Sequence, residues 1–429
     1  MGGLARTVEH DGWRVDLGGH RFYTTVPAVE ALWHEILPDD EFPLCRRMSR
    51  ILYRGRLYDY PLRAGNVVVN LGPLEAARCL ASYAWARARP PRDQGSYEGW
   101  LAARFGRRLY RTFFETYTEK VWGTPPRAMP ADWAAQRVRD LNLTRAILGA
   151  VGVGRATGQV RSLVEEFHYP RGGAGRMWER CRSLAQAHGA RFALETTVRS
   201  VHLHDGRAAA VGVTRPDGSP ALLPASHVVS SMPLGHLVSA MEPAAPPEVR
   251  AAAGGLTYRH FIVVALVVPA GVGFPDHWVY VHTPAVRVGR IQNYGRWSPD
   301  MVKEGRTCLG LEYFTSDHDE LWQAPEAALV ERGAAELEQL GLARAGDVEE
   351  GFAVRVPRAY PVYGRDHREK IRTIAGFLAT HASNVHAVGR NGMHRYNNQD
   401  HSMLTAMLAV ENILGASHDV WAVEAGRAA

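Results

Sequence analysis

Polar side chains gather in one short stretch of the chain, where an apolar strand pattern gives way to an apolar helix pattern. The strand residues are Val385, Ala387 and Val388, and the helix pattern runs from Met403 to Leu414. The side chains between them can accept hydrogen bonds from the free N–H groups of a helix start; they are Asn397, Asn398, Asp400 and Ser402. A helix start also carries a partial positive charge that attracts an anion. The stretch from Asn384 to Gly415 is therefore typical either of an anion-binding helix start or of an ordinary strand, turn and well-capped helix.

Glycine-rich turns are a second group that can bring backbone close to a ligand. Residues Asp16 to Phe22 have the pattern of a strand end followed by a Gly-Gly turn, and glycine allows backbone to approach a flat molecule closely. Two other groups, Gly152–Gly158 and Gly172–Gly175, are weaker candidates for a phosphate loop, because neither has the G-x-G-x-x-G spacing. Taken alone, each pattern indicates a tight turn.

Arginine and tyrosine side chains accompany strand patterns in the second half of the chain. An arginine fork binds a phosphate through parallel hydrogen bonds, and a tyrosine offers a flat wall with a hydroxyl. The residues of this kind, with neighbouring amides, are Arg290, Gln292, Asn293, Tyr294, Arg355, Arg358, Tyr360 and Tyr363. Each one taken alone is more typical of a structural side chain.

Helical patterns must position part of this chemistry, and they dominate from about Pro73 to Arg145. Apolar residues recur at helical spacing in EGWLAARFGRRLYRTFFETYTEKVW, so its aromatic side chains are expected in a core or a pocket wall. Glu119 and Lys120 differ from them, because a charged pair within an aromatic helix is costly unless it is paired. We expect them either to find partners or to form a surface pair.

Strands and helices alternate after this region. A helix is expected from Trp178 to His188, followed by strands at Arg191–Leu194 and Thr197–Leu203, a turn at 216–218 and a strand at His227–Met232. Between Leu256 and Val356 the segments HFIVVALVV, HWVYVH and CLGLEYF predict strands, interrupted by a helix from Pro325 to Leu340. The pattern indicates an α/β protein with a mixed sheet.

Composition bounds the class of protein. The chain has 429 residues, 46% of them hydrophobic, which suffices for two or three globular domains. The net charge of +6 is spread without a long basic run, so nucleic acid is not an expected partner, whereas an anionic small molecule suits the charge. The four cysteines show no spacing typical of a metal site, and they fit a reducing cytoplasm. The longest apolar run, Phe261 to Ala270, is too short to span a bilayer, and no signal peptide is evident.

The polar stretch near the C-terminus resembles a known flavin-binding signature. GRNGMHRYNNQDHSMLTAMLAVENI is similar to that of the FAD-dependent amine oxidase superfamily, in the branch whose members resemble UDP-galactopyranose mutase and protoporphyrinogen oxidase. Other blocks of the chain agree in order: DLGGHRFYT, SRILYRGRLYDYPL, FFETYTEKVWGTPPRAMPADWAAQRV, YPRGGAGRMWE, VVSSMPL, VRVGRIQNYGRWSPDMV and RVPRAYPVYG. The resemblance spans nearly the whole chain.

This resemblance implies an FAD-binding Rossmann-like domain, N-terminally incomplete, with a helical cap and a mixed β-sheet substrate domain. The implied FAD-domain segments are 1–48, 161–240 and 371–429, the cap is 49–160 and the substrate domain is 241–370. The implied cofactor contacts are Gly2, Gly3, Arg6, Gly18, Gly19, His20, Arg21, Val198, Gly389, Arg390, Tyr396, Asn397, Asn398, Gln399 and Ser402. The implied substrate contacts are Arg290, Asn293, Tyr294, Arg358 and Tyr360, with Arg290 and Tyr360 the leading candidates. No catalytic residue and no metal ligand is implied.

The start of the chain raises a question about the cofactor. Gly2, Gly3 and Arg6 resemble the doublet that follows the first βαβ unit in this family. The G-x-G-x-x-G loop of that unit places the FAD pyrophosphate on a helix N-terminus, and none precedes Met1. Either the gene starts further upstream or strong FAD binding is lost. We expect the sequence as given to bind FAD weakly or not at all, and a version extended by roughly 30 residues to copurify with it.

Three functions are compatible with the resemblance. The first is an FAD-dependent oxidoreductase that transfers a hydride from a small-molecule substrate to flavin N5. The second is a mutase of the UDP-galactopyranose mutase kind, in which reduced flavin attacks the anomeric carbon of a nucleotide sugar without net redox change. The third is a flavin-free scaffold. The expected partner is a small molecule, either a nucleotide sugar or another anionic metabolite.

Overall fold

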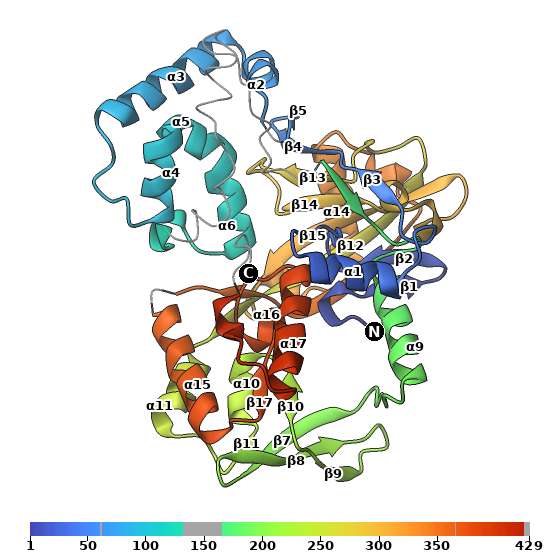
Figure 1. The fold of residues 1–429 in the computed structure, drawn as a ribbon. Helices are drawn as coiled ribbons and strands as arrows, with labels where there is room; N and C mark the ends of the chain where they lie inside the picture. Colours follow the sequence, from blue (N-terminus) through green and yellow to red (C-terminus); the bar gives the residue numbers. More distant parts are fainter. Residues whose placement is uncertain (61, 132–164, 365, 424–429) are drawn as a thin grey trace. The chain divides into compact units, whose positions relative to one another are not determined.

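A computed structural model describes residues 1–60, 62–131, 165–364 and 366–423 of the chain (Figure 1). The end of the expected helical region, residues 132–145, and the glycine group Gly152–Gly158 lie outside the described residues. The chain divides into two compact units. The first comprises Met1–Tyr23, Leu37–Trp178 and His260–Pro357, and the second comprises Thr24–Ile36, Glu179–Arg259 and Arg358–Ala429.

A seven-stranded mixed sheet is the main element of the first unit. Its order is β16-β12-β15-β14-β13-β4-β5. The strands are β4 (Ser49–Tyr53), β5 (Arg56–Asp59), β12 (Thr257–Pro269), β13 (Trp278–Val281), β14 (Arg290–Asn293), β15 (Arg306–Thr315) and β16 (Glu350–Val362). Strands β13 and β4 run parallel, whereas β12, β15, β14 and β13 pair antiparallel in that order. The strand patterns of β12, β13 and β15 are confirmed, as is the mixed sheet.

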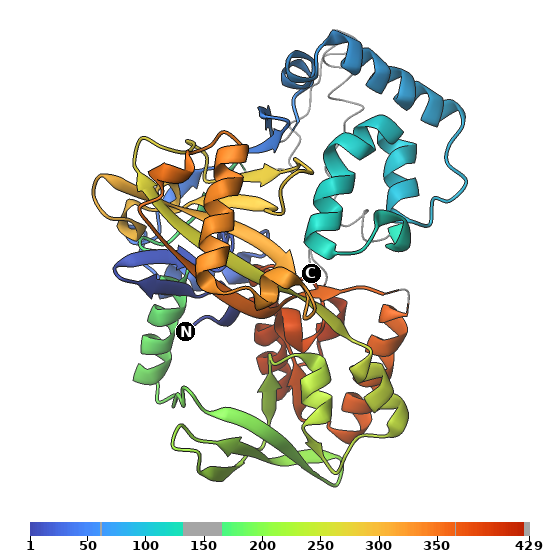
Figure 2. The same ribbon diagram turned by 180° about the vertical axis from the view of Figure 1, so that it is seen from behind.

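The two faces of this sheet differ because side chains alternate along a strand. On one face Val279, Ile291 and Leu311 form a buried core with Leu329 and Leu337 of α14 (Glu326–Gln339). Helix α14 lies across this face in front of the strands in Figure 2. The intervening residues Trp278, Tyr280, Arg290, Gln292 and Glu312 are consequently on the opposite face, where the register sets Tyr280 against Arg290 and Arg290 against Glu312.

Short helices form a second part of the first unit. They are α2 (Ala64–Leu71), α3 (Pro73–Ala88), α4 (Tyr97–Phe105), α5 (Arg107–Tyr110), the π turn η2 (Arg111–Glu115), α6 (Thr116–Trp122) and η3 (Pro126–Ala128). The predicted helical character of this region is confirmed as far as residue 131. Glu119 is exposed, whereas the Nζ of Lys120 is half-buried and donates to the carbonyls of Val281, Thr283 and Val288 at 3.2, 2.7 and 3.0 Å. Backbone carbonyls therefore provide the partners that this lysine requires.

Smaller elements complete the first unit. A hairpin of β1 (Thr7–His10) and β2 (Trp13–Asp16) follows η1 (Gly3–Ala5), and β3 (Leu44–Arg46) pairs with β6 (Glu166–His168). Helix α9 (Gly175–Ala187), which belongs to the first unit up to Trp178 and to the second from Glu179, confirms the helix predicted after the Gly172–Gly175 turn. The remaining short helices are α12 (Tyr294–Trp297), η4 (Pro299–Met301), α13 (Glu320–Gln323) and η5 (Ala345–Asp347).

The second unit combines a small sheet with a parallel strand pair and helices. The sheet has the order β11-β7-β8-β9. Its strands are β7 (Thr197–His204), β8 (Arg207–Thr214), β9 (Pro220–Pro224) and β11 (Met241–Glu242), and the parallel pair is β10 (Val228–Ser230) and β17 (Val385–Ala387). The helices are α1 (Pro27–Ile36), α10 (Leu234–Ser239), α11 (Pro247–Gly254), α15 (His367–His381), α16 (Gly389–Gly392), α17 (Gln399–Ile413) and η6 (Val420–Ala422). Its core includes Val201, Leu237, Ile374 and Val385.

Two local expectations are wrong. Residues Arg191–Leu194 form no strand, since they pair with no neighbouring strand and leave Leu194 51% exposed. The polar residues before α17 do not cap it as expected, because Asn398 occupies the N-cap position without a side-chain hydrogen bond and Asp400 and Ser402 lie inside the helix. The predicted strand at Val385, the predicted helix that follows it and the α/β fold class are confirmed. No helix in the described ranges combines the length and apolar composition that crossing a bilayer requires.

Candidate functional site

The end of β2 is fixed by a buried carboxylate. Asp16 accepts hydrogen bonds from the hydroxyls of Thr7 at 2.6 Å and Tyr169 at 2.8 Å, and from the backbone N–H of Ala174 at 3.2 Å. Burial raises the pKa of Asp16 to about 6, although these donors oppose the rise. The carboxylate thus joins the hairpin to the Gly172–Gly175 turn and defines where the following Gly18–Gly19 turn begins.

Glycine is required where these turns meet. Gly173 has a φ of +110°, and a Cβ at that position would lie 2.4 Å from the Oγ1 of Thr7. Gly18 has a φ of +111°, and its missing Cβ would lie 3.7 Å from a guanidinium nitrogen of Arg290. At Gly19 a Cβ would lie 3.2 Å from the side-chain nitrogen of Gln292. Backbone therefore approaches the polar face of the sheet more closely than a side chain would allow.

Arg290 lies within a bonded row on this polar face. Its Nε donates to Glu312, which is fully buried and also accepts from the side chain of Gln292 at 2.7 Å. The indole N–H of Trp297 donates to Gln292 at 2.8 Å. Burial raises the pKa of Glu312, and Arg290 opposes that rise. Part of the positive charge of Arg290 is consequently balanced by the protein itself.

The Gly18–Gly19 turn carries two further residues that the sequence singled out. The Nε2 of His20 lies 3.1 Å from the carbonyl of Leu17. Arg21 is half-buried, and its charge lowers the pKa of Arg47, which burial lowers most. The structure therefore brings residues implied for the cofactor, Gly18 to Arg21, together with Arg290, which was implied for the substrate.

Arg47 lies in an aromatic cluster that sequence reasoning missed. It donates to the carbonyl of Tyr60 at 2.7 Å, and its guanidinium lies 5.5 Å from the centre of the Tyr60 ring. Tyr280 approaches Tyr60 at 5.1 Å and Tyr117 at 5.5 Å between ring centres. The three rings are half-buried. The one available sequence signal was the strand pattern of HWVYVH, which places Tyr280 two residues from Trp278 and hence on the same face of the sheet.

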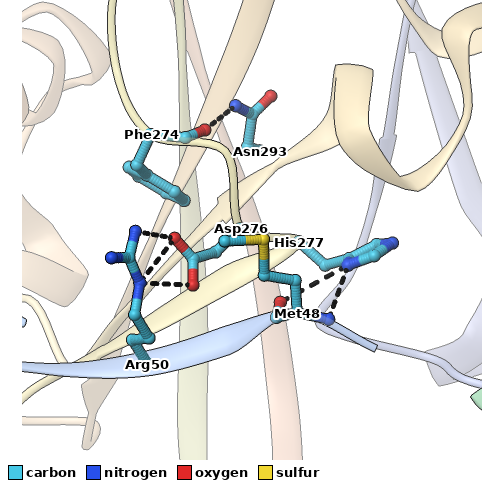
Figure 3. Close-up of polar contacts among 6 residues, drawn as sticks. All are labelled: Met48, Arg50, Phe274, Asp276, His277 and Asn293. Carbon is cyan, nitrogen blue, oxygen red and sulfur yellow. Dashed lines mark hydrogen bonds and ion pairs between the residues drawn. The ribbon is translucent and has the colours of Figure 1, made fainter. Parts of the chain in front are cut away.

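Buried polar contacts hold the backbone around Arg47, as Figure 3 shows. Arg50 pairs with Asp276, which is fully buried, through a contact of 2.6 Å. The backbone N–H of Met48 donates to the Nδ1 of His277 at 3.2 Å. Asn293 donates to the carbonyl of Phe274 at 2.8 Å and so fixes the same loop before β13. Contacts at Met48 and Arg50 therefore anchor the segment that follows Arg47 and continues into β4.

Two residues implied for the substrate, Asn293 and Tyr294, are almost completely buried. The side-chain oxygen of Asn293 accepts from Thr307 at 2.7 Å, and the Tyr294 hydroxyl donates to the carbonyl of Asp16 at 2.8 Å. Their polar atoms are thus bonded to the protein, and Tyr294 holds the backbone of Asp16, which precedes the Gly18–Gly19 turn.

The opening residues implied for the cofactor lie against α9. The carbonyl of Gly2 accepts from Ala5 at 2.9 Å, Gly3 begins η1, and Arg6 is exposed. Gly2 has a φ of +95°, and a Cβ there would lie 2.5 Å from the indole ring of Trp178. This turn therefore packs on the start of α9 and makes none of the contacts that join Gly18 to Arg290.

A second cluster, in the second unit, surrounds Arg390. The guanidinium lies 5.3 Å from the ring centre of Tyr360 and 4.8 Å from that of Tyr396, and its Nε donates to the carbonyl of Asn397 at 2.9 Å. The two tyrosine rings are nearly parallel, with centres 6.0 Å apart. The carbonyl of Arg358, whose φ is +54°, accepts from Asn391 at 2.9 Å. Arg358 and Tyr360, implied for the substrate, thus meet Arg390 and Tyr396, implied for the cofactor.

The turn before α17 is held from several sides. Tyr396 N–H donates to the hydroxyl of Tyr363 at 2.6 Å, and Gly389 N–H donates to the hydroxyl of Thr405 at 2.9 Å. Ser402 N–H donates to the carbonyl of Asn398 at 3.0 Å, as expected one turn into a helix that starts at Gln399. Figure 1 shows α16 and α17 side by side. The helix start is therefore placed by backbone contacts and not by side-chain caps.

Asn397 is one of several exceptions to the rule that buried polar atoms are bonded. The residue is 1% exposed, and within the described part of the chain neither its side-chain oxygen nor its side-chain nitrogen has a hydrogen-bond partner. Gly389 follows the C-terminal end of β17, whose parallel neighbour β10 ends at Ser230. Ligands bind at such strand ends in open α/β sheets. Val198, in contrast, is 39% exposed on β7 of the other sheet of this unit.

Other site chemistries receive no support. The four cysteines are free thiols. Among the described residues no group of histidine, cysteine, aspartate and glutamate side chains could hold a metal ion.

Comparison with known proteins defines the family. The structure is similar to that of reduced UDP-galactopyranose mutase, with a TM-score of 0.84 and 21% identity over 99% of this chain and 89% of the other. A protein from Exiguobacterium sp. 255-15 provisionally named protoporphyrinogen oxidase has a TM-score of 0.68 and 16% identity over 96% and 90% of the two chains.

Putrescine oxidase bound to putrescine has a TM-score of 0.57 and 15% identity, over 96% and 91% of the two chains. These likenesses show the fold. A search of curated proteins gave no significant match. The model of the family described as flavin containing amine oxidoreductase matches residues 1–363. The chain therefore belongs to the flavin-containing amine oxidoreductase family.

Proposed function

We propose that the chain is an FAD-dependent oxidoreductase that transfers a hydride from a small-molecule substrate to the flavin. The flavin would supply a two-electron acceptor at its N5 atom. The observation that carries this proposal is the start of α17. Among the described residues, this helix has no side-chain cap, and the amide of the buried Asn397 before it has no hydrogen-bond partner. The polar edge of a flavin ring gains negative charge on reduction, and such a site can accommodate a group of this kind.

The residues before α17 fit the N1/C2=O edge of a flavin ring. Free N–H groups at the start of a helix of fifteen residues are oriented donors, and they stabilise negative charge that develops in front of them. The amide of Asn397 can add a donor and an acceptor. Arg390 contributes positive charge, and its contacts with the rings of Tyr360 and Tyr396 and with the carbonyl of Asn397 position the guanidinium. We propose that these residues raise the affinity for the reduced flavin over the oxidised one.

We propose that Arg47 and its tyrosines, all within the first unit, contact the substrate. Within the described residues no ion pair involves Arg47, and Glu165 acts on it only at longer range, so we propose that its charge is available to a substrate anion, whereas Arg290 is already paired with Glu312. Tyr60, Tyr117 and Tyr280 offer ring faces and edges to a flat or cyclic substrate. We propose that Arg290 orients Tyr280 and the Gly18–Gly19 turn, and that Asn293 and Tyr294 support that turn. In this proposal Arg47 is the residue that binds the substrate anion.

A second candidate function rests on the same aromatic cluster. An arginine flanked by tyrosines also suits a nucleotide sugar, because it can bind the diphosphate while the rings contact the base or the sugar. This arrangement favours the mutase alternative, in which no net oxidation occurs. The protein groups are the same in both functions, so the fate of the electrons must distinguish them.

Anaerobic reduction tests the proposal. The purified chain is loaded with FAD, freed of excess cofactor, and mixed without dithionite with primary amines including putrescine, and separately with UDP-galactopyranose. Loss of the oxidised flavin absorbance on adding a substrate supports the oxidoreductase. Conversion of UDP-galactopyranose that occurs only after dithionite reduction supports the mutase. Bound flavin that no substrate reduces, and that supports no conversion after dithionite reduction, contradicts both functions.

A further inference from the structure

A cleft on the helical side of the first unit has no role in the chemistry described above. It has a volume of about 910 Å³ and lies among the β4–β5 hairpin, α2, α3 and the helix that runs from α5 into η2. Its lining includes six arginines: Arg54, Arg56, Arg78, Arg107, Arg108 and Arg111. Neither Arg47 nor its three tyrosines line this cleft, so it is distinct from the proposed substrate contacts.

Charge in this cleft is poorly balanced. Among the described residues that line the cleft, Glu75 is the one carboxylate, and it already bonds the guanidinium of Arg108 at 2.8 Å and lies 3.6 Å from Arg78. Within the described residues Arg54, Arg56, Arg107 and Arg111 form no ion pair; Glu115 affects Arg111 only at longer range. Like charges held close together destabilise a fold. A cluster of this kind is therefore expected to be stabilised by an anion.

Several of the lining residues are held in place. Arg56 donates to the carbonyl of Asn70 at 2.6 Å, and the side chain of Asn70 donates to the carbonyl of Leu57 at 2.9 Å, which fixes α2 on β5. The Ser82 hydroxyl accepts from the backbone N–H of Arg108 at 3.1 Å and ties α3 to α5. The arginines consequently come from elements whose spacing is set by hydrogen bonds, so less ordering is needed when a ligand binds.

An aromatic wall completes the cleft. Tyr53 and Tyr58 line it, and both rings contact Phe113, with centres 6.2 and 5.2 Å away. The guanidinium of Arg54 lies 5.2 Å from the centre of the Tyr53 ring. The volume is within the range of roughly 300–1,000 Å³ that small-molecule sites occupy. Size, charge and aromatic surface together match a small molecule that carries several phosphates.

We propose that this arginine cleft is a second ligand site, which binds a small molecule through a diphosphate or longer polyphosphate group. Arginine forks bind phosphate oxygens through paired, charge-assisted hydrogen bonds. Two or more linked phosphates offer more oxygens and more negative charge than one phosphate, so they can engage arginines from both α5–η2 and the β4–β5 hairpin. The site therefore prefers pyrophosphate and tripolyphosphate over orthophosphate.

Calorimetric titration of the full chain with inorganic pyrophosphate tests this inference. The cleft variant is Arg107→Gln/Arg111→Gln, since both residues are exposed and unpaired by carboxylates. The charge-matched control is Arg180→Gln/Arg372→Gln, two exposed residues on α9 and α15. We expect pyrophosphate to bind the wild type at least tenfold more tightly than orthophosphate. The cleft variant should lose at least tenfold in affinity, which is about 1.4 kcal/mol, and the control should not.

The alternative outcomes overturn the inference. No pyrophosphate binding by the wild type, equal binding of orthophosphate, or an equal loss in the two variants would each show that the cleft is not a phosphate site. If the cleft variant unfolds, Arg54→Gln on the hairpin replaces it in the same comparison. None of these measurements requires flavin or turnover, so failure here leaves the proposed function intact, and failure of flavin reduction leaves this site intact.

Discussion

Replacing Asp16 by asparagine should change how stability depends on pH. The carboxylate is buried, and its pKa is raised to about 6, above the value near 4 that an aspartate has in an unfolded chain. Between these two values the folded protein binds more protons than the unfolded one, so the free energy of unfolding falls as pH rises. At about 1.36 kcal/mol for each unit of pKa difference, the full contribution is about 3 kcal/mol.

The stabilisation from Asp16 is fully present below about pH 4 and lost as pH rises through 6. About 2 kcal/mol of it should disappear between pH 4 and pH 7. An asparagine side chain binds no proton in this range, so the variant Asp16→Asn lacks this change. Urea unfolding of wild type and variant at several pH values gives the difference in unfolding free energy, with Asp11→Asn as a control for an exposed carboxylate. A difference that stays constant from pH 4 to pH 7 would refute the account of Asp16 as a buried, proton-binding anchor.

Three further predictions concern the fold and the cofactor. Lys120→Met removes the donor shared by three backbone carbonyls and should lower the free energy of unfolding by at least about 2 kcal/mol in urea denaturation; an unchanged midpoint would contradict the assigned contacts. Gly173→Ala should destabilise by about 2 kcal/mol or more, because its Cβ would collide with Thr7, whereas Gly346→Ala has open space and should have little effect. Asn398→Asp should lower the flavin midpoint potential by tens of millivolts in a spectroscopic redox titration, since about 30 mV corresponds to 1.4 kcal/mol; the neutral Asn398→Ser should not, and equal potentials would contradict the proposed contact.

Local patterns allowed much of the fold to be predicted. The apolar helical pattern from Met403 to Leu414 lies in α17, and the continuous apolar run HFIVVALVV lies in β12, where it is buried. The short segment Arg191–Leu194 was predicted wrongly, because a few apolar residues form a strand only when a neighbouring strand and a buried face are present. The residues of such a short segment do not show whether a neighbouring strand will pair with it or whether one of its faces will be buried.

The candidate site was harder to predict because its residues meet through pairing between distant strands. Tyr280 lies beside Arg290 only because β13 pairs with β14, and Arg47 joins them through the pairing of β13 with β4. The burial of Asn293 depends on the loop at Phe274. Likewise, nothing in the polar run before α17 showed that Asn398 would leave the helix uncapped or that Asn397 would be buried without a partner. Composition singled out that stretch, but whether it can bind a ligand depends on the turn that the hydroxyl of Tyr363 holds.

Hydrogen–deuterium exchange with and without saturating FAD tests the central claim, that the start of α17 binds the flavin. The account predicts slower exchange for peptides covering residues 396–402 when FAD is added, with no change in α14 (Glu326–Gln339), which packs on the apolar face of the seven-stranded sheet. Exchange at 396–402 that is the same with and without bound FAD would contradict it.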